Sequence, residues 1–471
     1  MLLTFQSFTN NPYVYDPRSN EIFRVDEHVF EELTTAGGNI SEIRDEKVRQ
    51  GFRDAGVSDE VLPLEDHDLF KKEIDAMQIG MRKLIIGLAH TCNLRCKYCI
   101  YSGNYADERS HEGKQMTEET ADRLIDVFYV KRGDDYPKMC IFYGGEPFTN
   151  FPILKRIVEK ITALRDDVGF SATTNGLMLK NEEILDFIKS YDFVINISFD
   201  GPSQEAMRID QNGRGTFNDL MGLIEHIAEK YPDFYREKVG FNVTVTPASD
   251  LHETVEFFNT NPLFSGKTLN VIRHYDPDNV FCRKYDLMDH EKTLRDEFDK
   301  LRREYPAVFK EHRPFHDGCY LSPLARLDQR PMGDVTRLPL NSCCYPGLNA
   351  VFVDIDGTCS PCERTEHIKL GSIYDDEPVN LKTAEELVKK YQEIAGRHCP
   401  RCWAARLCAK CFSHVRRGTV TEENFVANCD DFRESFRKSM ELFTTIKEID
   451  ENAFADVKVI TELPVKEKQK A

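Results

Sequence analysis

The sequence lacks any apolar run approaching the ~20 residues that a membrane-spanning helix requires. Its first residues, Met1 to Phe5, show neither the basic start nor the apolar stretch of a secretory signal. Positive charge is also scarce, because 62 Lys and Arg stand against 80 Asp and Glu, for a net charge of -18. Nucleic-acid binding depends on concentrated Lys and Arg, so we expect no nucleic-acid partner, no membrane association and a cytoplasmic protein.

The hydrophobic content of 41% and the aromatic content of 11% are those of a globular protein. A chain of 471 residues is too long for one hydrophobic core, and its length predicts about three domains. It contains 15 cysteines, which a cytoplasmic protein keeps reduced. Metal ligation is therefore the simplest explanation of so many thiols.

Three cysteines, Cys92, Cys96 and Cys99, follow the apolar run Leu84 to Ala89 at spacings of three and two residues. Three thiolates at a strand end can bind three irons of a cubane iron-sulfur cluster and leave the fourth iron open. A structural zinc site is the alternative, but it usually has four ligands arranged as two pairs. No fourth Cys or His stands at that spacing, although His90 is close.

With Tyr98 in front of the third cysteine, the octet Cys92 to Cys99 resembles the CxxxCxφC signature of the radical SAM superfamily. The resemblance implies a [4Fe-4S] cluster on the three cysteines, whose open iron binds the amino and carboxylate groups of S-adenosylmethionine. It also implies a 5'-deoxyadenosyl radical that removes a substrate hydrogen atom, and an external electron donor such as flavodoxin or ferredoxin. The cofactor would supply the chemistry and the protein would position it.

Residues 81 to about 275 alternate short apolar runs with helical patterns. The predicted strands are 83–89, 139–143, 169–173, 193–198, 239–245 and 269–272, and the predicted helices are 118–130, 153–164, 182–190, 217–228 and 252–258. Six strand-helix repeats predict an α/β fold, a partial (β/α)6 barrel of parallel strands. Sites in such sheets lie at the carboxyl ends of strands, which is where the cysteine octet falls.

Small polar motifs follow three further predicted strands. The first motif resembles the family's GGEP motif, which contacts the methionyl amino group, and glycine there allows close approach of backbone to a ligand. The resemblance also implies that the other motifs contact the carboxylate and the adenosine half of the cofactor. Helix capping and turn formation are the alternative explanation. The residues concerned are Gly144, Gly145, Glu146 and Pro147, then Asn175, then Ser198, Asp200 and Arg208.

A second group of cysteines lies towards the C-terminus and resembles the SPASM domain, which carries two auxiliary [4Fe-4S] clusters, so three clusters are implied in all. The last gap of this motif has two residues here, where three are usual. Paired CxxC motifs alone would also suit a zinc knuckle. The resemblance assigns Cys399, Cys402, Cys408 and Cys429 to the distal cluster, and Cys344, Cys362 and Cys411 to the nearer one, with Cys343, Cys359 or Cys319 as its fourth ligand. If none reaches it, that cluster keeps an open iron for a substrate thiolate. Cys140 and Cys282 are interpreted as small core residues.

The first 80 residues contain a hairpin signal, in which 11–16 and 21–25 flank a turn and helical patterns follow. This arrangement resembles the winged-helix-like module with which peptide-modifying enzymes bind the leader of a precursor, as a strand added to a sheet edge. A plain N-terminal cap is the alternative. The predicted domains are 1–80 for peptide recognition, 81–305 for the barrel and 306–450 for the SPASM domain, followed by a flexible tail over 451–471.

Enzymes of this organisation mostly modify ribosomally made peptides. We therefore favour a maturase that joins a cysteine sulfur of a ribosomal precursor peptide to carbon, as in sactipeptide and ranthipeptide synthases. A sulfatase-type maturase, with Glu363 as a carboxylate base, is the first alternative. A carbon-carbon crosslinking maturase is the second, and a zinc-bearing scaffold without enzymatic activity is the third.

Overall fold

The computed structural model describes residues 1–65, 81–105, 108–133, 135–267, 269–338, 346–411 and 420–457. They fall into two compact units. The barrel unit takes its described residues from Gly80–Leu321 and Pro346–Leu381, and the second unit takes them from Met1–Ile79, Ser322–Tyr345 and Lys382–Val459. Cys343 and Cys344 lie outside the described residues. Within the described part of the chain, no helix is long and apolar enough to cross a membrane.

The barrel unit is built on six parallel strands that neighbour one another in chain order. They are β4 (Lys83–Ala89), β5 (Met139–Gly144), β6 (Gly169–Thr174), β7 (Val194–Ser198), β8 (Val239–Val245) and β9 (Leu269–Arg273). Each begins and ends within one residue of its predicted bounds, so the predicted partial barrel is confirmed. Neighbouring carboxyl ends therefore lie along one edge of the sheet, as Ala89 of β4 and Gly144 of β5 do.

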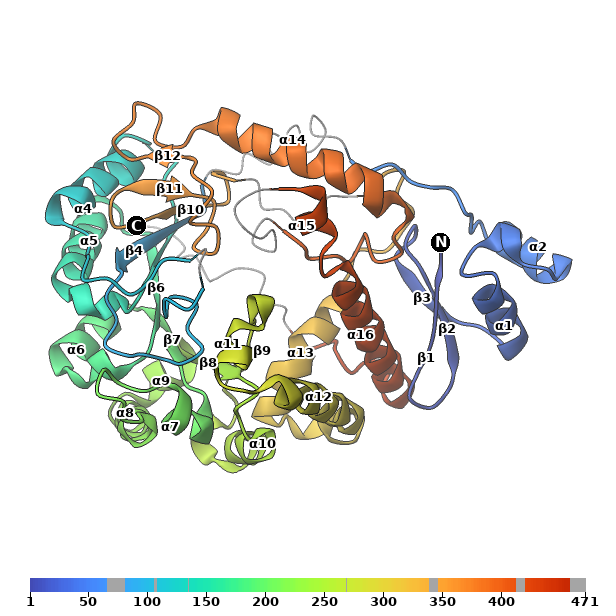
Figure 1. Cartoon of the computed structure of the whole chain (residues 1–471), viewed down its shortest axis with the longest axis horizontal. Helices are drawn as coiled ribbons and strands as arrows, with labels where there is room; N and C mark the ends of the chain where they lie inside the picture. Colours follow the sequence, from blue (N-terminus) through green and yellow to red (C-terminus); the bar gives the residue numbers. More distant parts are fainter. Residues whose placement is uncertain are drawn as a thin grey trace. The chain divides into compact units, whose positions relative to one another are not determined.

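Helices between the strands cover the outer face of this sheet (Figure 1). They include α4 (Glu118–Ile125), α5 (Phe151–Leu164), α6 (Glu182–Ser190), α8 (Phe217–Lys230) and α10 (Leu251–Thr260). In α5 the buried residues are Ile153, Leu154, Ile157, Val158 and Ile161. Their helical spacing forms one apolar stripe, which packs against the strands. The predicted helix 118–130 is α-helical only to Ile125 and continues as one π-helical turn over Asp126–Val130.

A seventh parallel strand extends the barrel sheet beyond β4. The strand β10 (Ala350–Val353) pairs with β4, and it is followed by the antiparallel strands β11 (Thr358–Ser360) and β12 (Gly371–Ser372). Val351 and Val353 are completely buried in the barrel core. The main chain of β10 covers the edge that β4 would otherwise leave open. Residues 346–381, which the sequence interpretation placed in the C-terminal domain, thus complete the sheet of the barrel.

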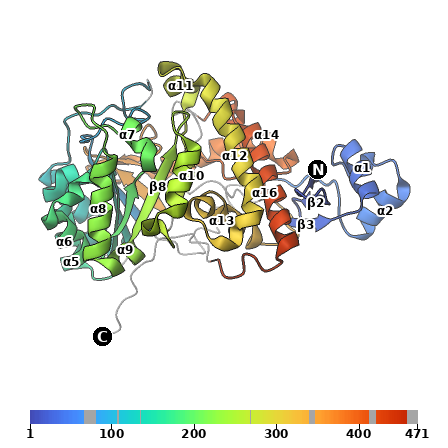
Figure 2. The ribbon, with the colours of Figure 1, turned by 90° about the horizontal axis from the view of Figure 1, so that it is seen from below.

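The second unit contains an antiparallel sheet of β1 (Leu3–Gln6), β2 (Pro12–Asp16) and β3 (Glu21–Arg24), in that order. The predicted hairpin is present as β2 and β3, whereas β1 was not foreseen. Two helices, α1 (Glu27–Thr35) and α2 (Glu46–Asp54), follow the sheet and lie close together (Figure 2). Apolar side chains from the start of the chain, β2, both helices and the segment between the helices form one small core, namely Leu2, Val14, Leu33, Ile40, Ile43 and Phe52.

Three further helices of this unit carry or flank the C-terminal cysteines: α14 (Leu381–His398), α15 (Glu422–Val426) and α16 (Cys429–Ile449). The N-terminal sheet is bonded to α16, because Tyr13 Oη donates to Glu448 Oε1 at 2.9 Å. The ring of Tyr15 packs edge-on against Trp403, with ring centres 6.4 Å apart. Beyond α16, Phe454 is 1% exposed and stacks on Phe443, so the ordered structure enters the predicted tail, of which 458–471 lie outside the described residues.

Candidate active site

The three cysteines of the octet line one cavity at the carboxyl ends of the barrel strands. This barrel cavity has a volume of about 320 Å³, within the usual range for small-molecule sites. Most of the predicted cofactor-binding residues line it together with the cysteines. They are Tyr98, Gly144, Gly145, Glu146, Asn175, Ser198 and Arg208. Residues from five separate strand ends and loops are therefore brought to one place.

The cysteine loop after β4 is held by hydrogen bonds from its main-chain amides to carbonyl groups of residues 207–209. Arg95 N donates to Ile209 O at 2.7 Å, and Lys97 N donates to Met207 O at 2.9 Å. None of the three cysteines is in a disulfide. Burial raises the pKa of Cys92 to about 11 and that of Cys96 to about 12, so both sulfurs are protonated at neutral pH. Three cysteine sulfurs outside disulfides in one cavity are a donor set that fits an iron-sulfur cluster, and bound iron would displace these protons.

The two glycines of the GGEP motif allow contact with the cysteine loop. A Cβ on Gly144 would lie 2.5 Å from Ala89 O, and a Cβ on Gly145 would lie 2.3 Å from Thr91 O. Because no Cβ atoms stand there, the main chains can pair: Gly145 N donates to Ala89 O at 2.6 Å, and Glu146 N donates to Thr91 O at 2.9 Å. The two glycines thus allow two protein loops to approach each other closely. The sequence interpretation had instead explained them by the close approach of a ligand. Pro147 begins the 3-10 turn Pro147–Asn150 and does not line the cavity.

Glu146 is a buried acceptor with three donors around it. Its carboxylate accepts hydrogen bonds from Asn175 N and Thr174 Oγ1, both at 2.7 Å, and from Phe148 N at 3.3 Å. Burial outweighs these bonds and raises the pKa of Glu146 to about 7. A cationic ligand group beside it would stabilise the carboxylate form. The position therefore suits an ammonium group of a bound ligand.

Tyr98, Asp200 and Arg208 form a buried chain of hydrogen bonds. Tyr98 Oη donates to Asp200 Oδ2 at 2.5 Å and accepts from Arg208 Nη1 at 2.7 Å. Asp200 does not line the cavity, but it contacts Arg208 both through Tyr98 and directly, with Asp200 Oδ2 3.9 Å from Arg208 Nη1. The Arg208 Nε atom is buried and has no hydrogen-bond partner among the described residues. An unpartnered buried donor in the cavity wall fits an anionic ligand group such as a carboxylate.

Two histidines of the cavity wall were missed by the sequence interpretation. His274 directly follows β9, and its Nε2 lies 3.2 Å from Tyr98 O. Its Nδ1 is buried without a hydrogen-bond partner among the described residues. His111 Nε2 lies 3.8 Å from Cys99 Sγ. The position after the sixth predicted strand is a signal that could have indicated His274, whereas no sequence pattern marks His111.

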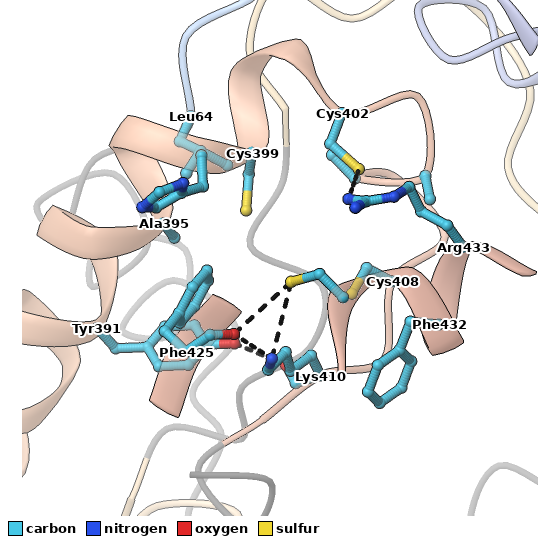
Figure 3. A pocket seen from close by; sticks show the side chains of 14 residues that line it. Leu64, Tyr391, Ala395, Cys399, Cys402, Cys408, Lys410, Phe425, Phe432 and Arg433 are labelled. Atoms are coloured by element: carbon cyan, nitrogen blue, oxygen red, sulfur yellow. Dashed lines mark hydrogen bonds between the residues drawn. The ribbon is translucent and has the colours of Figure 1, made fainter. Parts of the chain in front are cut away.

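The second unit brings together the four cysteines assigned to the distal cluster. Cys399, Cys402, Cys408 and Cys429 line one pocket, the cysteine pocket (Figure 3). Cys399 and Cys402 come from the 3-10 turn after α14 and its C-cap, and Cys429 opens α16. None of the four is in a disulfide. Among the described residues, no three His, Cys, Asp or Glu side chains are grouped around a position for a single metal ion.

The residues assigned to the nearer cluster are distributed differently. Cys362 follows β11 in the barrel unit, Cys411 lies in the second unit, and Cys343 and Cys344 lie outside the described residues. Cys359 is completely buried in the barrel core, and Cys319 lies on α13 (Pro314–Asp328) and packs against the same core. The ligand set of a nearer cluster thus stays a prediction.

Three other residues were interpreted individually. Glu363 lies close enough to Tyr143 for its charge to act on that phenol: burial first, and then Glu363, raise the pKa of Tyr143 to about 12. Tyr143 lines the barrel cavity. Cys140 and Cys282 are 0% and 1% exposed, which confirms their interpretation as core residues.

The comparisons with known proteins agree with this arrangement. Residues 86–259 match the family described as the radical SAM superfamily. The chain is 28% identical over 277 residues to an uncharacterized protein of Methanocaldococcus jannaschii, over 55% of this chain and 85% of that protein. It is 23% identical over 243 residues to the radical SAM cyclopropyl synthase TigE of Paramaledivibacter caminithermalis, over 49% of this chain and 48% of TigE. The match thus spans about half the length of TigE.

Among solved structures, native anSMEcpe with bound AdoMet superposes on 78% of this chain and 100% of its own. The TM-score is 0.54 at 20% identity, which shows a shared fold. The family match begins in β4 and ends within α10, so it contains the cysteine octet, the end of β4 and the four strands β5 to β8. The matched sequence, the parallel sheet and the cysteine-lined cavity identify residues 86–259 as a radical SAM domain in a partial α/β barrel.

Proposed function

We propose that this chain is a radical SAM maturase that forms a thioether between a cysteine sulfur and a carbon of a ribosomally made peptide. The observation that carries the proposal is that two separate sets of cysteines outside disulfides each line a cavity. One set lies in the radical SAM domain with the residues of a ligand site, and the other lies in the second unit. One site suits radical generation and the other suits uptake of an electron.

In the barrel cavity, Cys92, Cys96 and Cys99 would hold the cluster, with Glu146 at the methionyl ammonium and Arg208 at the carboxylate. When bound, the cluster and S-adenosylmethionine supply a radical that removes one hydrogen atom from the substrate. The chain's own residues prepare this site. Tyr98 orients Arg208, and Asn175 Nδ2 donates to Asn93 Oδ1 at 2.7 Å, which ties the cysteine loop to the end of β6.

Thioether formation is an oxidation, and its balance requires a second electron acceptor. A C–H bond and an S–H bond break, and one C–S bond forms. One hydrogen atom leaves on 5'-deoxyadenosine, the thiol hydrogen leaves as a proton, and one electron remains. An iron-sulfur cluster held by Cys399, Cys402, Cys408 and Cys429 would take up that electron.

The N-terminal sheet offers a place for the leader of the precursor. Its outer strand β3 follows β2 at the sheet edge, and Glu21 and Arg24 of β3 are exposed. A peptide can pair with such an edge through main-chain hydrogen bonds. A structure of anSMEcpe, similar to this chain with a TM-score of 0.51 at 18% identity, contains the bound peptide Cp18Cys, and this supports a peptide substrate.

The proposal is tested by anaerobic co-expression with a cysteine-containing precursor peptide encoded beside the gene. After reduction and thiol alkylation, the intact peptide mass should show loss of two hydrogen atoms per crosslink and blocked alkylation. The Cys92→Ala variant is the matched control and should leave the peptide unmodified. Loss of two hydrogen atoms with every thiol still alkylated would instead indicate carbon-carbon bonding, the chemistry in the name of TigE.

Sulfatase-type maturation is the second candidate, because Glu363 interacts with Tyr143 of the barrel cavity. Glu363 does not itself line that cavity, but a carboxylate close to it can act as the base that oxidation of a cysteine to formylglycine requires. An unchanged precursor mass, together with an aldehyde formed on a sulfatase-derived cysteine peptide, would favour this activity. Glu363→Gln should then abolish aldehyde formation and leave S-adenosylmethionine binding unchanged.

A further inference from the structure

Lys410 is a buried cation at the wall of the cysteine pocket. It is 2% exposed, and a dashed line in Figure 3 joins its ammonium group to one of the pocket sulfurs. Nζ donates to Phe425 O, to Ala427 O at 2.5 Å and to Cys429 Sγ at 3.8 Å. An ammonium group has three hydrogens, and these three acceptors use all of them. The charge is therefore held in one position, against a single sulfur.

Arg433 supplies a second cation to a different sulfur. It lies one helical turn after Cys429 on α16, and its Nη1 donates to Cys402 Sγ at 3.9 Å. Its Nη2 donates to Asp430 Oδ1, on the solvent side of the same turn. The Arg433 side chain is 37% exposed, so water screens its charge more than that of Lys410.

The remaining wall of the pocket is mostly apolar. It includes Tyr391, Ala395, Ala404, Ala405, Phe425 and Phe432. Charges interact more strongly in such surroundings than in water. A cluster with four thiolate ligands is an anion, and one-electron reduction makes it more negative without requiring a proton. Cations that donate to the ligand sulfurs therefore stabilise the reduced form more than the oxidised form.

We propose that Lys410 and Arg433 are positioning residues that raise the reduction potential of the cluster held by Cys399, Cys402, Cys408 and Cys429, so that it accepts the electron released as the substrate bond forms. This inference rests on the proposed function, in which the electron comes from the substrate carbon radical during C–S bond formation. The cluster is reduced by that one electron, and the thiol proton goes to solvent.

The test is a potentiometric titration followed by electron paramagnetic resonance. It uses the full-length chain with Cys92, Cys96 and Cys99 replaced by alanine, so that the radical SAM cluster gives no signal. The titration step, or wave, of the distal cluster is identified as the one that disappears in the Cys399→Ala variant. Lys410→Met should lower the equilibrium constant for its reduction at least tenfold, about 59 mV. Arg433→Met should lower it less, because its side chain is more exposed.

Charge and structural support are separated by matched variants. Lys410→Arg and Arg433→Lys keep the cations and should keep the potential close to that of the parent. Arg401→Met removes an exposed cation from the turn that carries Cys399 and Cys402, and it should leave the wave unchanged. Iron content and thermal unfolding show whether each variant retains the cluster and its fold.

An unchanged wave in Lys410→Met with its iron retained would overturn the inference. If Lys410→Met loses the cluster, the test passes to Arg433→Met. An unchanged reduction potential in that variant overturns the inference, and a lowered potential supports it. The proposed function can fail while the inference holds. This would be the case if the variants shift the reduction potential but the precursor peptide stays unmodified, because thioether formation would then be disproved and the effect of the two cations on the cluster would not. Zinc in place of iron in the parent protein would overturn both.

Discussion

At the scale of single residues, burial decides the charge of Glu146. Three donors lower its pKa, and Arg208 lowers it further, but the loss of solvent outweighs them and the pKa rises to about 7. The group thus changes its charge near neutral pH while the cavity is empty. A bound ammonium group would favour the carboxylate form, so ligand binding and proton release are linked.

We predict that binding of S-adenosylmethionine weakens as the pH falls below about 7. The raised pKa means that protonated Glu146 becomes the main form of the empty site below this pH, and a neutral carboxyl attracts an ammonium group less. Well below it, affinity should fall up to tenfold per pH unit. Anaerobic equilibrium dialysis between pH 5.5 and 8 measures this change. Glu146→Gln should bind more weakly without that slope, and a flat profile in the unaltered protein would contradict the prediction.

We also predict that Tyr98→Phe weakens S-adenosylmethionine binding by affecting Arg208. The substitution removes one hydrogen bond from Asp200 and one from Arg208, both of them buried. Leaving buried polar groups unsatisfied costs about 1–3 kcal/mol, so the dissociation constant should rise roughly 5- to 150-fold if Arg208 loses its position. Tyr275→Phe alters an exposed tyrosine of the same cavity and should change binding little. Equal effects of the two substitutions would exclude a positioning role for Tyr98.

At the scale of elements, the site depends on how the ends of neighbouring strands meet. The loops after β4 and β5 contact each other through main-chain atoms, and the contact leaves no room for a side chain at Gly145. The Cys92 loop is therefore positioned by the β5 loop as well as by its own sequence. The added strand β10 supports the opposite edge of β4.

Gly145→Ala should consequently displace the cysteine loop. Its Cβ would lie 2.3 Å from Thr91 O, a backbone atom, so one of the two loops must move. We expect a loss of stability of about 1–3 kcal/mol, as for other overpacked positions, and less iron bound by the radical SAM site. Thermal unfolding and iron analysis measure both effects. Gly113→Ala, with no atom within 4 Å of the added carbon, is the control, and equal behaviour of the two variants would refute the explanation.

At the scale of the whole molecule, the two cysteine sites belong to different compact units. Separate units allow one site to be removed without unfolding the other. The second unit also joins the first residues of the chain to the C-terminal cysteines, since β2 contacts Trp403 and is bonded to α16. The N-terminal sheet and the cysteine pocket are therefore parts of one structural unit.

Replacing Cys92, Cys96 and Cys99 together by alanine should abolish cleavage of S-adenosylmethionine and leave the cysteine pocket intact. Formation of 5'-deoxyadenosine, followed by chromatography, should fall to background because no cluster remains in the barrel cavity. Iron bound by the second unit and its unfolding transition should be retained. Retained cleavage in this triple variant would disprove the proposed mechanism.

The sequence by itself determined the six barrel strands and part of the cavity lining, although not His111 or His274. Strand periodicity located β4 to β9 within a residue, and local motifs indicated Cys92, Glu146 and Arg208, because strand patterns and ligand spacings are properties of short segments. Only the tertiary structure decided the rest. It added β10 to the sheet, set Tyr98 between Asp200 and Arg208, and brought Lys410 to Cys429. These contacts join residues far apart in the chain or depend on which helix end meets which loop, and packing alone determines them.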